Sequence, residues 1–190
     1  MTDPEANPWQ TLSTRRVYDN PWIGVREDQV LRPDGEPGIY GVVEFKNLAI
    51  GIVPVDENGY TWLVGQYRYT MDEYTWEIPA GGCPPGETPL ETAVRELAEE
   101  VGLTATRWTS LGPVQLSNSC TAERGEIFLA EGLTMGESAP EGSEVLQIEK
   151  IPLQRALDMA HDGRIADGVS IIGLWRAART LAERGNPAAF

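Results

Sequence analysis

Residues 81–103 constrain this chain more than any other segment, because they join a glycine-rich loop to an acidic helix. Thr88 can serve as the N-cap of that helix, Pro89 fits its first position, and Glu91 completes a capping box. Gly102 suits the left-handed position that ends a helix. The spacing therefore predicts a helix of roughly 13 residues that begins at Pro89.

The predicted helix has an apolar face that must pack against a core. The side chains on that face are Leu90, Ala93, Val94, Leu97 and Val101. Glu96, Glu99 and Glu100 lie off it, and Glu96 and Glu100 are one turn apart, so three carboxylates converge on one edge. Like charges at this spacing repel each other, and a bound cation would remove the repulsion. Oxygen ligands without a neighbouring His or Cys favour Mg²⁺, with Mn²⁺ possible, over Zn²⁺.

The loop at residues 80–86 is rich in glycine and proline, so backbone groups can approach a ligand there without obstruction by side chains. An isolated Glu-x-x-Glu-Glu is typical of an ordinary surface helix with solvated glutamates. Here, however, the segment matches every fixed position of a 23-residue pattern. The matching positions are Gly81, Glu87 and the run Arg95-Glu96-Leu97-Ala98-Glu99-Glu100-Val101-Gly102-Leu103. The segment resembles the Nudix box of the Nudix hydrolase superfamily.

This resemblance implies that the loop and the helix bind the metal ions that hold a diphosphate. The implied metal ligands are Ala80, through its backbone carbonyl, and the carboxylates of Glu96, Glu99 and Glu100, of which Glu99 and Glu100 also count as catalytic. Gly81 and Gly82 would approach the substrate. Glu87 and Arg95 would brace the loop against the helix through an ion pair.

Beyond the box, the chain resembles the ADP-ribose and nucleoside diphosphate sugar pyrophosphatases over residues 17–180. The segments that carry this similarity are 66–69, 76–82, 121–124 and 162–167. The implied reaction is hydrolysis of a pyrophosphate bond, most simply that of ADP-ribose, to a nucleoside monophosphate and a sugar phosphate. Divalent ions would bridge the diphosphate and activate a water for in-line attack on phosphorus. Pro113 comes earlier than the proline that many members of this branch carry, which leaves another sugar nucleotide such as GDP-mannose as an alternative.

The same resemblance gives roles to residues outside the box. Arg68 would contact a phosphate or the distal sugar through its guanidinium fork, or else be a plain surface arginine. Glu77 would bond sugar hydroxyls or the outer shell of a metal, or else pair with Arg68. Glu141 and Glu144 are the candidates for the general base, in a loop suited to act as a lid, although solvated loop acids are the alternative. His161 is the only histidine and lies in a predicted helix, where we expect a structural role.

Composition fits one compact catalytic domain with an appendage. A net charge of −14 and a pI near 4.4 disfavour nucleic acid and anionic membranes as partners. A polyanionic small molecule could still bind where metal ions and a few arginines invert the local potential. No apolar run is long enough to cross a bilayer, and Cys83 and Cys120 form no Cys-x-x-Cys pair, so we expect a cytoplasmic protein with reduced thiols.

The pattern of strands and helices predicts an α/β protein. We expect a flexible tail at residues 1–11, a small antiparallel β subdomain at 12–46, and a catalytic domain at 47–190. The subdomain would contain strands within residues 17–30 and 38–46. Further strands are expected at 49–55, 61–69, 108–116, 125–130 and 145–151, and helices at 153–161 and 170–183, while residues 76–79 lead the chain into the glycine-rich loop. Strands interleaved with helices in this way indicate a mixed sheet between helices, the α/β/α sandwich that the resemblance also implies. Members of the resembled branch commonly dimerise through the N-terminal subdomain, so a homodimer is expected.

Three rival functions follow from the same residues. A Ser-His-Asp hydrolase would need a nucleophile near His161, but no Gly-x-Ser-x-Gly occurs. A non-catalytic sensor of nucleotide sugars would not need Glu96, Glu99 and Glu100 together. A hydrolase of nucleoside triphosphates would not need the N-terminal β region or the C-terminal helices.

Overall fold

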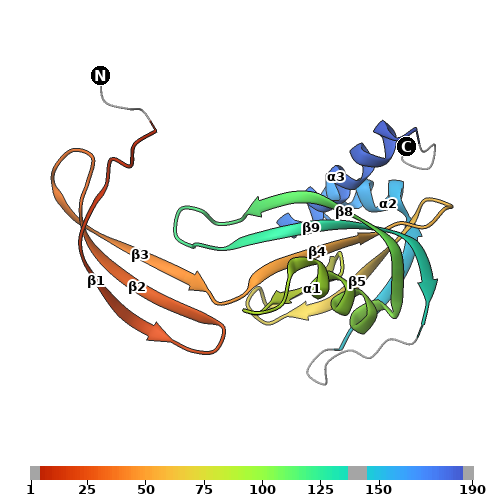
Figure 1. Ribbon diagram of the computed structural model, residues 1–190, viewed down its shortest axis with the longest axis horizontal. Coiled ribbons are helices and arrows are strands. Elements are labelled where there is room, and N and C mark those ends of the chain that lie inside the picture. Colours follow the sequence, from red (N-terminus) through yellow and green to blue (C-terminus); the bar gives the residue numbers. More distant parts are fainter. Residues whose placement is uncertain (1–4, 137–144, 186–190) are drawn as a thin grey trace. The chain divides into compact units, whose positions relative to one another are not determined.

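The computed structural model describes residues 5–136 and 145–185 (Figure 1). The chain divides into two compact units. The N-terminal unit consists of Met1–Asn47 together with Gln115–Glu123, and the larger unit consists of Leu48–Val114 together with Arg124–Phe190. The sequence pattern predicts a change of organisation near residue 47. It does not predict that the distant segment Gln115–Glu123 groups with the N-terminal strands.

The N-terminal unit is an antiparallel sheet in the order β1-β2-β3, with β1 at Gln10–Asp19, β2 at Ile23–Leu31 and β3 at Pro37–Phe45. The strand β1 begins inside the expected tail. A turn at Asn20 divides the strand region expected at residues 17–30, because the Asn20 side-chain oxygen accepts the N–H groups of Trp22 at 2.9 Å and Ile23 at 2.7 Å.

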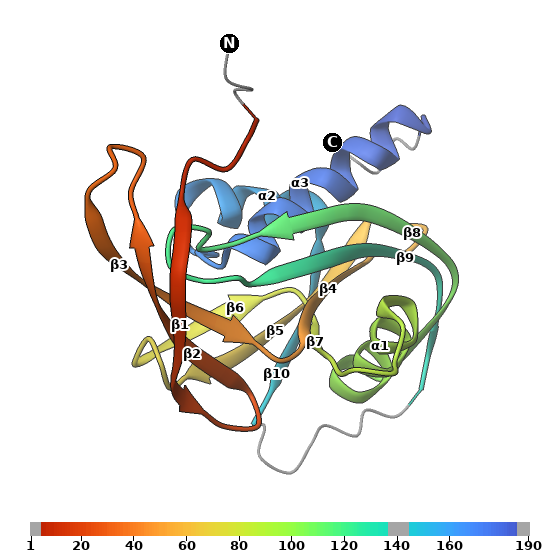
Figure 2. The same ribbon diagram turned by 60° about the vertical axis from the view of Figure 1, so that its left-hand side comes forward.

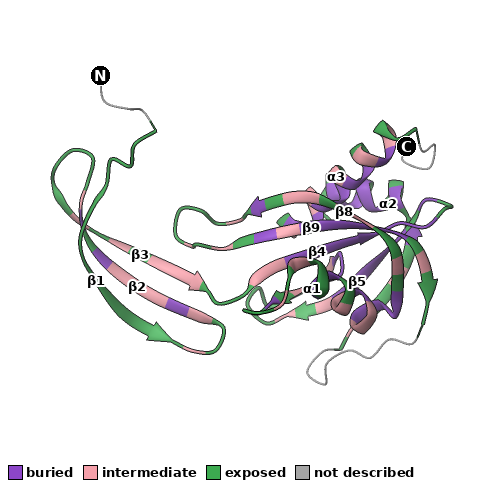
Figure 3. Ribbon diagram, in the orientation of Figure 1, coloured by how far each residue is buried: buried purple, intermediate pink, exposed green. Residues whose placement is uncertain are grey.

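The segment Gln115–Glu123 joins this unit through hydrogen bonds to β3. The Val43 N–H donates to the Cys120 carbonyl at 3.0 Å, and the Ala122 N–H donates to the Val43 carbonyl at 2.9 Å. The Tyr40 hydroxyl donates to the Ser119 carbonyl at 2.7 Å. Every residue of β1 is exposed, as Figure 3 shows in green. Of the three strands of this unit, only the central β2 contains buried residues, namely Gly24, Asp28 and Val30.

The larger unit contains two sheets. A mixed four-stranded sheet has the order β7-β4-β9-β8, in which β4 runs parallel to β9 and antiparallel to β7. An antiparallel sheet has the order β10-β5-β6. The strand bounds are β4 Leu48–Pro54, β5 Tyr60–Arg68, β6 Glu73–Glu77, β7 Ala80–Cys83, β8 Leu103–Gln115, β9 Arg124–Met135 and β10 Gln147–Pro152. The α/β class is confirmed, but the strands form two sheets where the sequence suggested one.

Helices cover both faces of the mixed sheet (Figures 1 and 2). They are α1 at Pro89–Glu96, which continues as a π-helix at Leu97–Val101, α2 at Leu153–Asp162 and α3 at Gly168–Glu183. Along β4, Ile50 and Ile52 belong to a buried cluster with Leu97 of the π-helix. Gly51, on the opposite face, lies so close to α3 that an added Cβ would stand 2.7 Å from Val169. Alternate strand residues thus pack against opposite helical layers.

No helix in the described parts of the chain combines the length and the apolar character needed to cross a membrane.

The acidic helix begins as its sequence predicts. The Thr88 hydroxyl accepts the Glu91 N–H at 3.3 Å, and the Glu91 carboxylate accepts the Thr88 N–H at 2.8 Å, which forms the full capping box. Such a cap contributes about 1 kcal/mol of stability. The predicted apolar face is partly wrong, because Leu90 and Val94 are 43% and 44% exposed. Buried Thr92, which bonds to the preceding loop, stands on the packed side instead.

Candidate active site

The candidate site residues gather in the larger unit, where β5, β6 and β7 end or begin near the last turns of the acidic helix. Arg68 ends β5, Glu77 ends β6, and Ala80 begins β7. Glu96 ends α1, and Glu99 and Glu100 lie on the π-helix. The candidate bases Glu141 and Glu144 lie outside the described residues.

The Glu96 carboxylate lies directly against the backbone of Gly81. A Cβ added at Gly81 would overlap the carboxylate carbon and both carboxylate oxygens, at separations under 3.0 Å that real Cβ atoms essentially never show. Any side chain at residue 81 would therefore displace Glu96. The glycine of the loop leaves the space that this carboxylate occupies.

Glu100 is buried, with 3% of its surface exposed, and its carboxylate accepts the backbone N–H of Ala80 at 3.0 Å. The sequence placed this residue off the packed face of an α-helix. The helix instead changes to π geometry over Leu97–Val101 and ends at Gly102, whose φ of 71° is left-handed. A π-helical turn shifts the angular positions of the side chains relative to an α-helix, and such turns are frequent at functional sites. Here the shifted turn brings a carboxylate onto the first residue of β7.

Arg95 is the centre of an ion-pair network that holds the loop and three glutamates. It donates to both carboxylate oxygens of Glu87, at 3.2 and 3.1 Å, and to the Gly82 carbonyl at 3.4 Å. Its Nη1 donates to Glu96 at 2.7 Å and to Glu99 at 2.9 Å. Hydrogen bonding from Arg95, with a further bond from a threonine, holds the pKa of Glu87 below its usual value, and the same contact with Glu87 raises the pKa of Arg95. The network neutralises part of the repulsion that the sequence pattern creates.

Arg68 and Glu77 form a bidentate ion pair. The Arg68 Nε donates to Glu77 Oε1 at 2.9 Å, and its Nη2 donates to Glu77 Oε2. The Thr75 hydroxyl donates to Glu77 Oε1 at 2.6 Å. Glu77 is only 6% exposed, and burial alone would raise its pKa, but the bonds from Arg68 and Thr75 outweigh burial and hold the pKa below 4.5. Both Glu77 oxygens are thus engaged by protein, which is the ion-pair alternative that the sequence left open.

The lowered pKa of Glu77 predicts a specific loss of stability in acid. Because the folded pKa lies below the unfolded value of 4.5, the pair stabilises the fold fully above about pH 5. That stability should be lost as the pH falls through the folded pKa and Glu77 becomes protonated. A Glu77→Gln variant should therefore show a shallower decline in urea-unfolding free energy below pH 5 than the wild type. Equal acid slopes in the two proteins would contradict the assignment.

The donor set around Gly81 fits a hard divalent cation. The residues that surround it offer carboxylate and carbonyl oxygens, and Gly81 leaves room for the Glu96 carboxylate. Within residues 5–136 and 145–185, no group of three or more His, Cys, Asp or Glu side chains is arranged to hold a metal ion by itself. Mg²⁺ rarely uses such a cage, because it retains waters and binds through one or two carboxylates plus substrate phosphates. A partial protein site of this kind is therefore the expected form.

Two threonines of this site were not identified from the sequence. The Thr92 hydroxyl donates to Glu87 at 2.8 Å, and Thr75 donates to Glu77. Thr75 and Glu77 stand two residues apart, and strand side chains at that spacing share a face, so their contact could have been foreseen. Thr92 lies on the helix and Glu87 on the loop before it, and no spacing rule predicts their bond.

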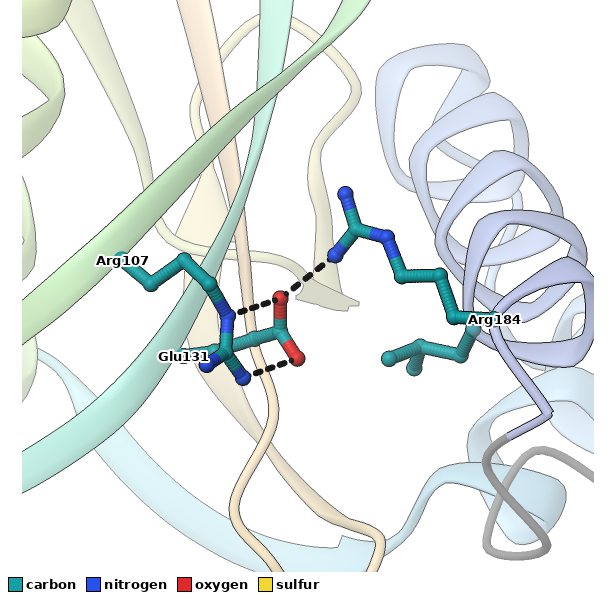
Figure 4. A pocket seen from close by; sticks show the side chains of 4 residues that line it. Arg107, Glu131 and Arg184 are labelled. Atoms are coloured by element: carbon teal, nitrogen blue, oxygen red, sulfur yellow. Dashed lines mark hydrogen bonds and ion pairs between the residues drawn. The ribbon is translucent and has the colours of Figure 1, made fainter.

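A separate pocket of about 400 Å³ lies elsewhere in the larger unit, lined by Arg107, Glu131, Leu181 and Arg184. Figure 4 shows Glu131 held between the two arginines. Arg107 donates to both of its oxygens, at 2.9 and 2.7 Å, and Arg184 donates at 2.8 Å. The bonds from Arg107, with help from Arg184, hold the pKa of Glu131 below its usual value. None of the candidate site residues lines this pocket, and the cluster ties the end of α3 to β8 and β9.

The site combines a glycine-rich loop, an acidic helical turn and the Arg68–Glu77 ion pair on a mixed α/β scaffold. Comparison with known protein families identifies the class of protein that has these features. Residues 45–169, more than half of the chain, match the model of the NUDIX domain. Residues 9–43 match the model of the nucleoside diphosphate sugar hydrolase N-terminal domain. The chain therefore belongs to the Nudix hydrolase family. Nudix hydrolases are generally dependent on divalent metal ions.

Individual relatives indicate which branch of the family the chain resembles. The chain is 33% identical over 169 residues to the ADP-ribose pyrophosphatase of Mycobacterium tuberculosis, covering 87% of this chain and 81% of the relative. It is 28% identical over 160 residues to the ADP-ribose pyrophosphatase of Bacillus subtilis, covering 83% and 86%. The crystal structure of an ADP compounds hydrolase superposes with a TM-score of 0.86 at 22% identity, covering 97% of this chain and all of that one. The resemblance to the ADP-ribose pyrophosphatase branch is confirmed.

Proposed function

We propose that this Nudix hydrolase cleaves the pyrophosphate bond of a nucleoside diphosphate sugar, with ADP-ribose as the first candidate, and that it requires Mg²⁺ or Mn²⁺. The products are a nucleoside monophosphate and a sugar phosphate. The names of the two bacterial relatives support ADP-ribose as substrate. A homodimer and a cytoplasmic location stay predictions.

The observation that carries the proposal is the Glu96 carboxylate against Gly81, with Glu96 and Glu99 both bonded to Arg95 and Glu100 bonded to the next residue of the loop, Ala80. Glu96, Glu99, Glu100 and the Ala80 carbonyl are the groups that would hold the cation. When bound there, a divalent cation would neutralise diphosphate charge and acidify the attacking water. Arg95 contacts Glu96 and Glu99 and is itself held by Glu87, so it ties both carboxylates to the glycine-rich loop.

In the proposed reaction, Arg68 binds a phosphate of the substrate. Glu77 engages its Nε and Nη2 edge, so the guanidinium plane is fixed before substrate arrives. Its remaining edge can donate to a phosphate oxygen, as charge-assisted bonds from arginine commonly do. Glu77 therefore orients Arg68, and its contact with sugar hydroxyls or the outer shell of a metal stays a prediction. Glu141 and Glu144 stay the predicted candidates for the general base that takes the proton of the attacking water.

Steady-state kinetics with a panel of substrates test the proposal. The expected result is a kcat/KM for ADP-ribose that exceeds those for GDP-mannose, UDP-glucose and ATP, with AMP and ribose 5-phosphate as products by ³¹P NMR. EDTA should abolish turnover, and added Mg²⁺ or Mn²⁺ should restore it. Tight binding of ADP-ribose without hydrolysis would contradict the proposal and identify a sensor. Preferred hydrolysis of another sugar nucleotide would overturn the choice of substrate alone.

A further inference from the structure

The backbone that joins β6 to β7 carries the site, and three different elements hold it in place. The Ala80 N–H donates to Glu100 of the π-helix, and the Pro79 carbonyl accepts the Ile52 N–H of β4 at 2.8 Å. The third bond comes from α3, because the Ile78 N–H donates to the Ser170 hydroxyl oxygen at 2.9 Å. Ile78 follows Glu77 directly, so this bond fixes the residue that orients Arg68.

The Ser170 hydroxyl has a defined direction. It donates its single hydrogen to the Asp167 carboxylate at 2.7 Å, so its lone pairs are left to accept the Ile78 N–H. Asp167 also accepts the Ser170 backbone N–H at 2.7 Å and thereby caps α3. Ser170 has no exposed surface and Ile78 has 1%, so water cannot replace a lost acceptor.

The residues before α3 set the position of the hydrogen-bond relay that runs from Asp167 through Ser170 to Ile78. Gly163 ends α2 with a φ of 86°, in the left-handed region. Ile165 is fully buried, and its N–H donates to the Met159 carbonyl at 2.9 Å. These contacts hold the short connection to Asp167 against the body of the larger unit. The relay from Asp167 through Ser170 to Ile78 is thus rigid at both ends.

We propose that Asp167 and Ser170 are positioning residues for pyrophosphate hydrolysis, acting through the Ile78 backbone on the Arg68–Glu77 pair and on strand β7. This inference rests on the proposed function. Without the Ser170 hydroxyl, the Ile78 N–H has no acceptor, and the segment must shift to find one. A displacement of about 1 Å at catalytic groups can cost roughly 100-fold in rate.

The test compares three variants of the full chain. Ser170→Ala should lower kcat/KM for ADP-ribose by at least about 10-fold. Asp167→Asn keeps an oxygen that can accept the Ser170 hydroxyl and should retain most of the activity. Leu181→Ala removes buried packing at the far end of α3, where no bond to the site exists. It should lower the melting temperature by at least as much as Ser170→Ala does, while kcat/KM stays within about 2-fold, because cavities act on stability.

Hydrogen exchange gives a readout that does not depend on activity. The Ile78 amide should exchange at least about 10-fold faster in Ser170→Ala than in wild type, while the buried Val55 amide, which donates to the Ala130 carbonyl of β9 at 2.9 Å, keeps its protection. An unchanged Ile78 rate, or a loss of kcat/KM no larger than that of Leu181→Ala, would overturn the relay. If the wild type hydrolyses no sugar nucleotide, the proposed function fails, and the exchange rates still decide whether Ser170 holds this backbone.

Discussion

A Glu100→Gln variant is expected to lose roughly 1,000-fold in kcat/KM for ADP-ribose while it stays folded. A divalent cation supplies several kcal/mol of charge stabilisation in the transition state, and each 1.36 kcal/mol is a tenfold change in rate. Glutamine removes the charge of the carboxylate but keeps an oxygen that can accept the Ala80 N–H. Because the half-buried Ala80 N–H stays paired, the melting temperature should change little.

The matched control for this variant is Glu183→Gln, an exposed glutamate of α3 that pairs only with Arg179 in the part of the chain that the structure describes. It removes the same charge from a helix outside the site and should leave kcat/KM within about 2-fold, since exposed ion pairs contribute little. Activity of Glu100→Gln that matches this control would show that Glu100 has no part in the chemistry. Unfolding by urea, measured on both variants, separates lost chemistry from lost structure.

A Gly81→Ala variant should lose roughly 100-fold in activity with little loss of stability. The added methyl group would overlap the Glu96 carboxylate, which is the far end of a flexible side chain and can swing away at small cost to the fold. The carboxylate would then no longer lie where a cation could meet it. Misplacement of a catalytic group by about 1 Å can cost about this factor. Steady-state kinetics and thermal unfolding of the purified variant check both halves of the expectation.

Gly41→Ala is the control for that substitution, because an added Cβ at Gly41 meets no atom within 4 Å. It should keep wild-type activity. If Gly81→Ala instead unfolds the protein at low temperature, the glycine serves the fold, and its role in admitting Glu96 is refuted. If Gly81→Ala is fully active, the observed position of Glu96 is irrelevant to turnover.

Local sequence signals were sufficient for the parts of the site that lie within one element. The capping residues Thr88 and Glu91 predicted the start of the helix, and Gly102 predicted its end, because each acts on backbone groups next to it. The convergence of Glu96, Glu99 and Glu100 on one edge, which ideal α-helical geometry predicts, stays a prediction.

Contacts between distant elements could not be predicted in this way. The burial of Glu100 accompanies a π-helical turn, for which no simple spacing rule exists. The bond from Ser170 to Ile78 joins residues 92 positions apart, so only the packing of α3 on the sheet creates it. The grouping of Gln115–Glu123 with the N-terminal strands likewise depends on tertiary packing.

We propose that the glutamates of the acidic helix bind a divalent cation at the diphosphate. Electron paramagnetic resonance of Mn²⁺ tests this directly, because protein-bound Mn²⁺ loses the sharp signal of the free ion. The titration would use the wild type and a Glu96→Gln/Glu100→Gln double variant, each with a non-hydrolysable methylene analogue of ADP-ribose. We expect the wild type to take up Mn²⁺ at concentrations at least about 10-fold lower than the double variant does. Equal uptake by the two proteins would contradict the claim.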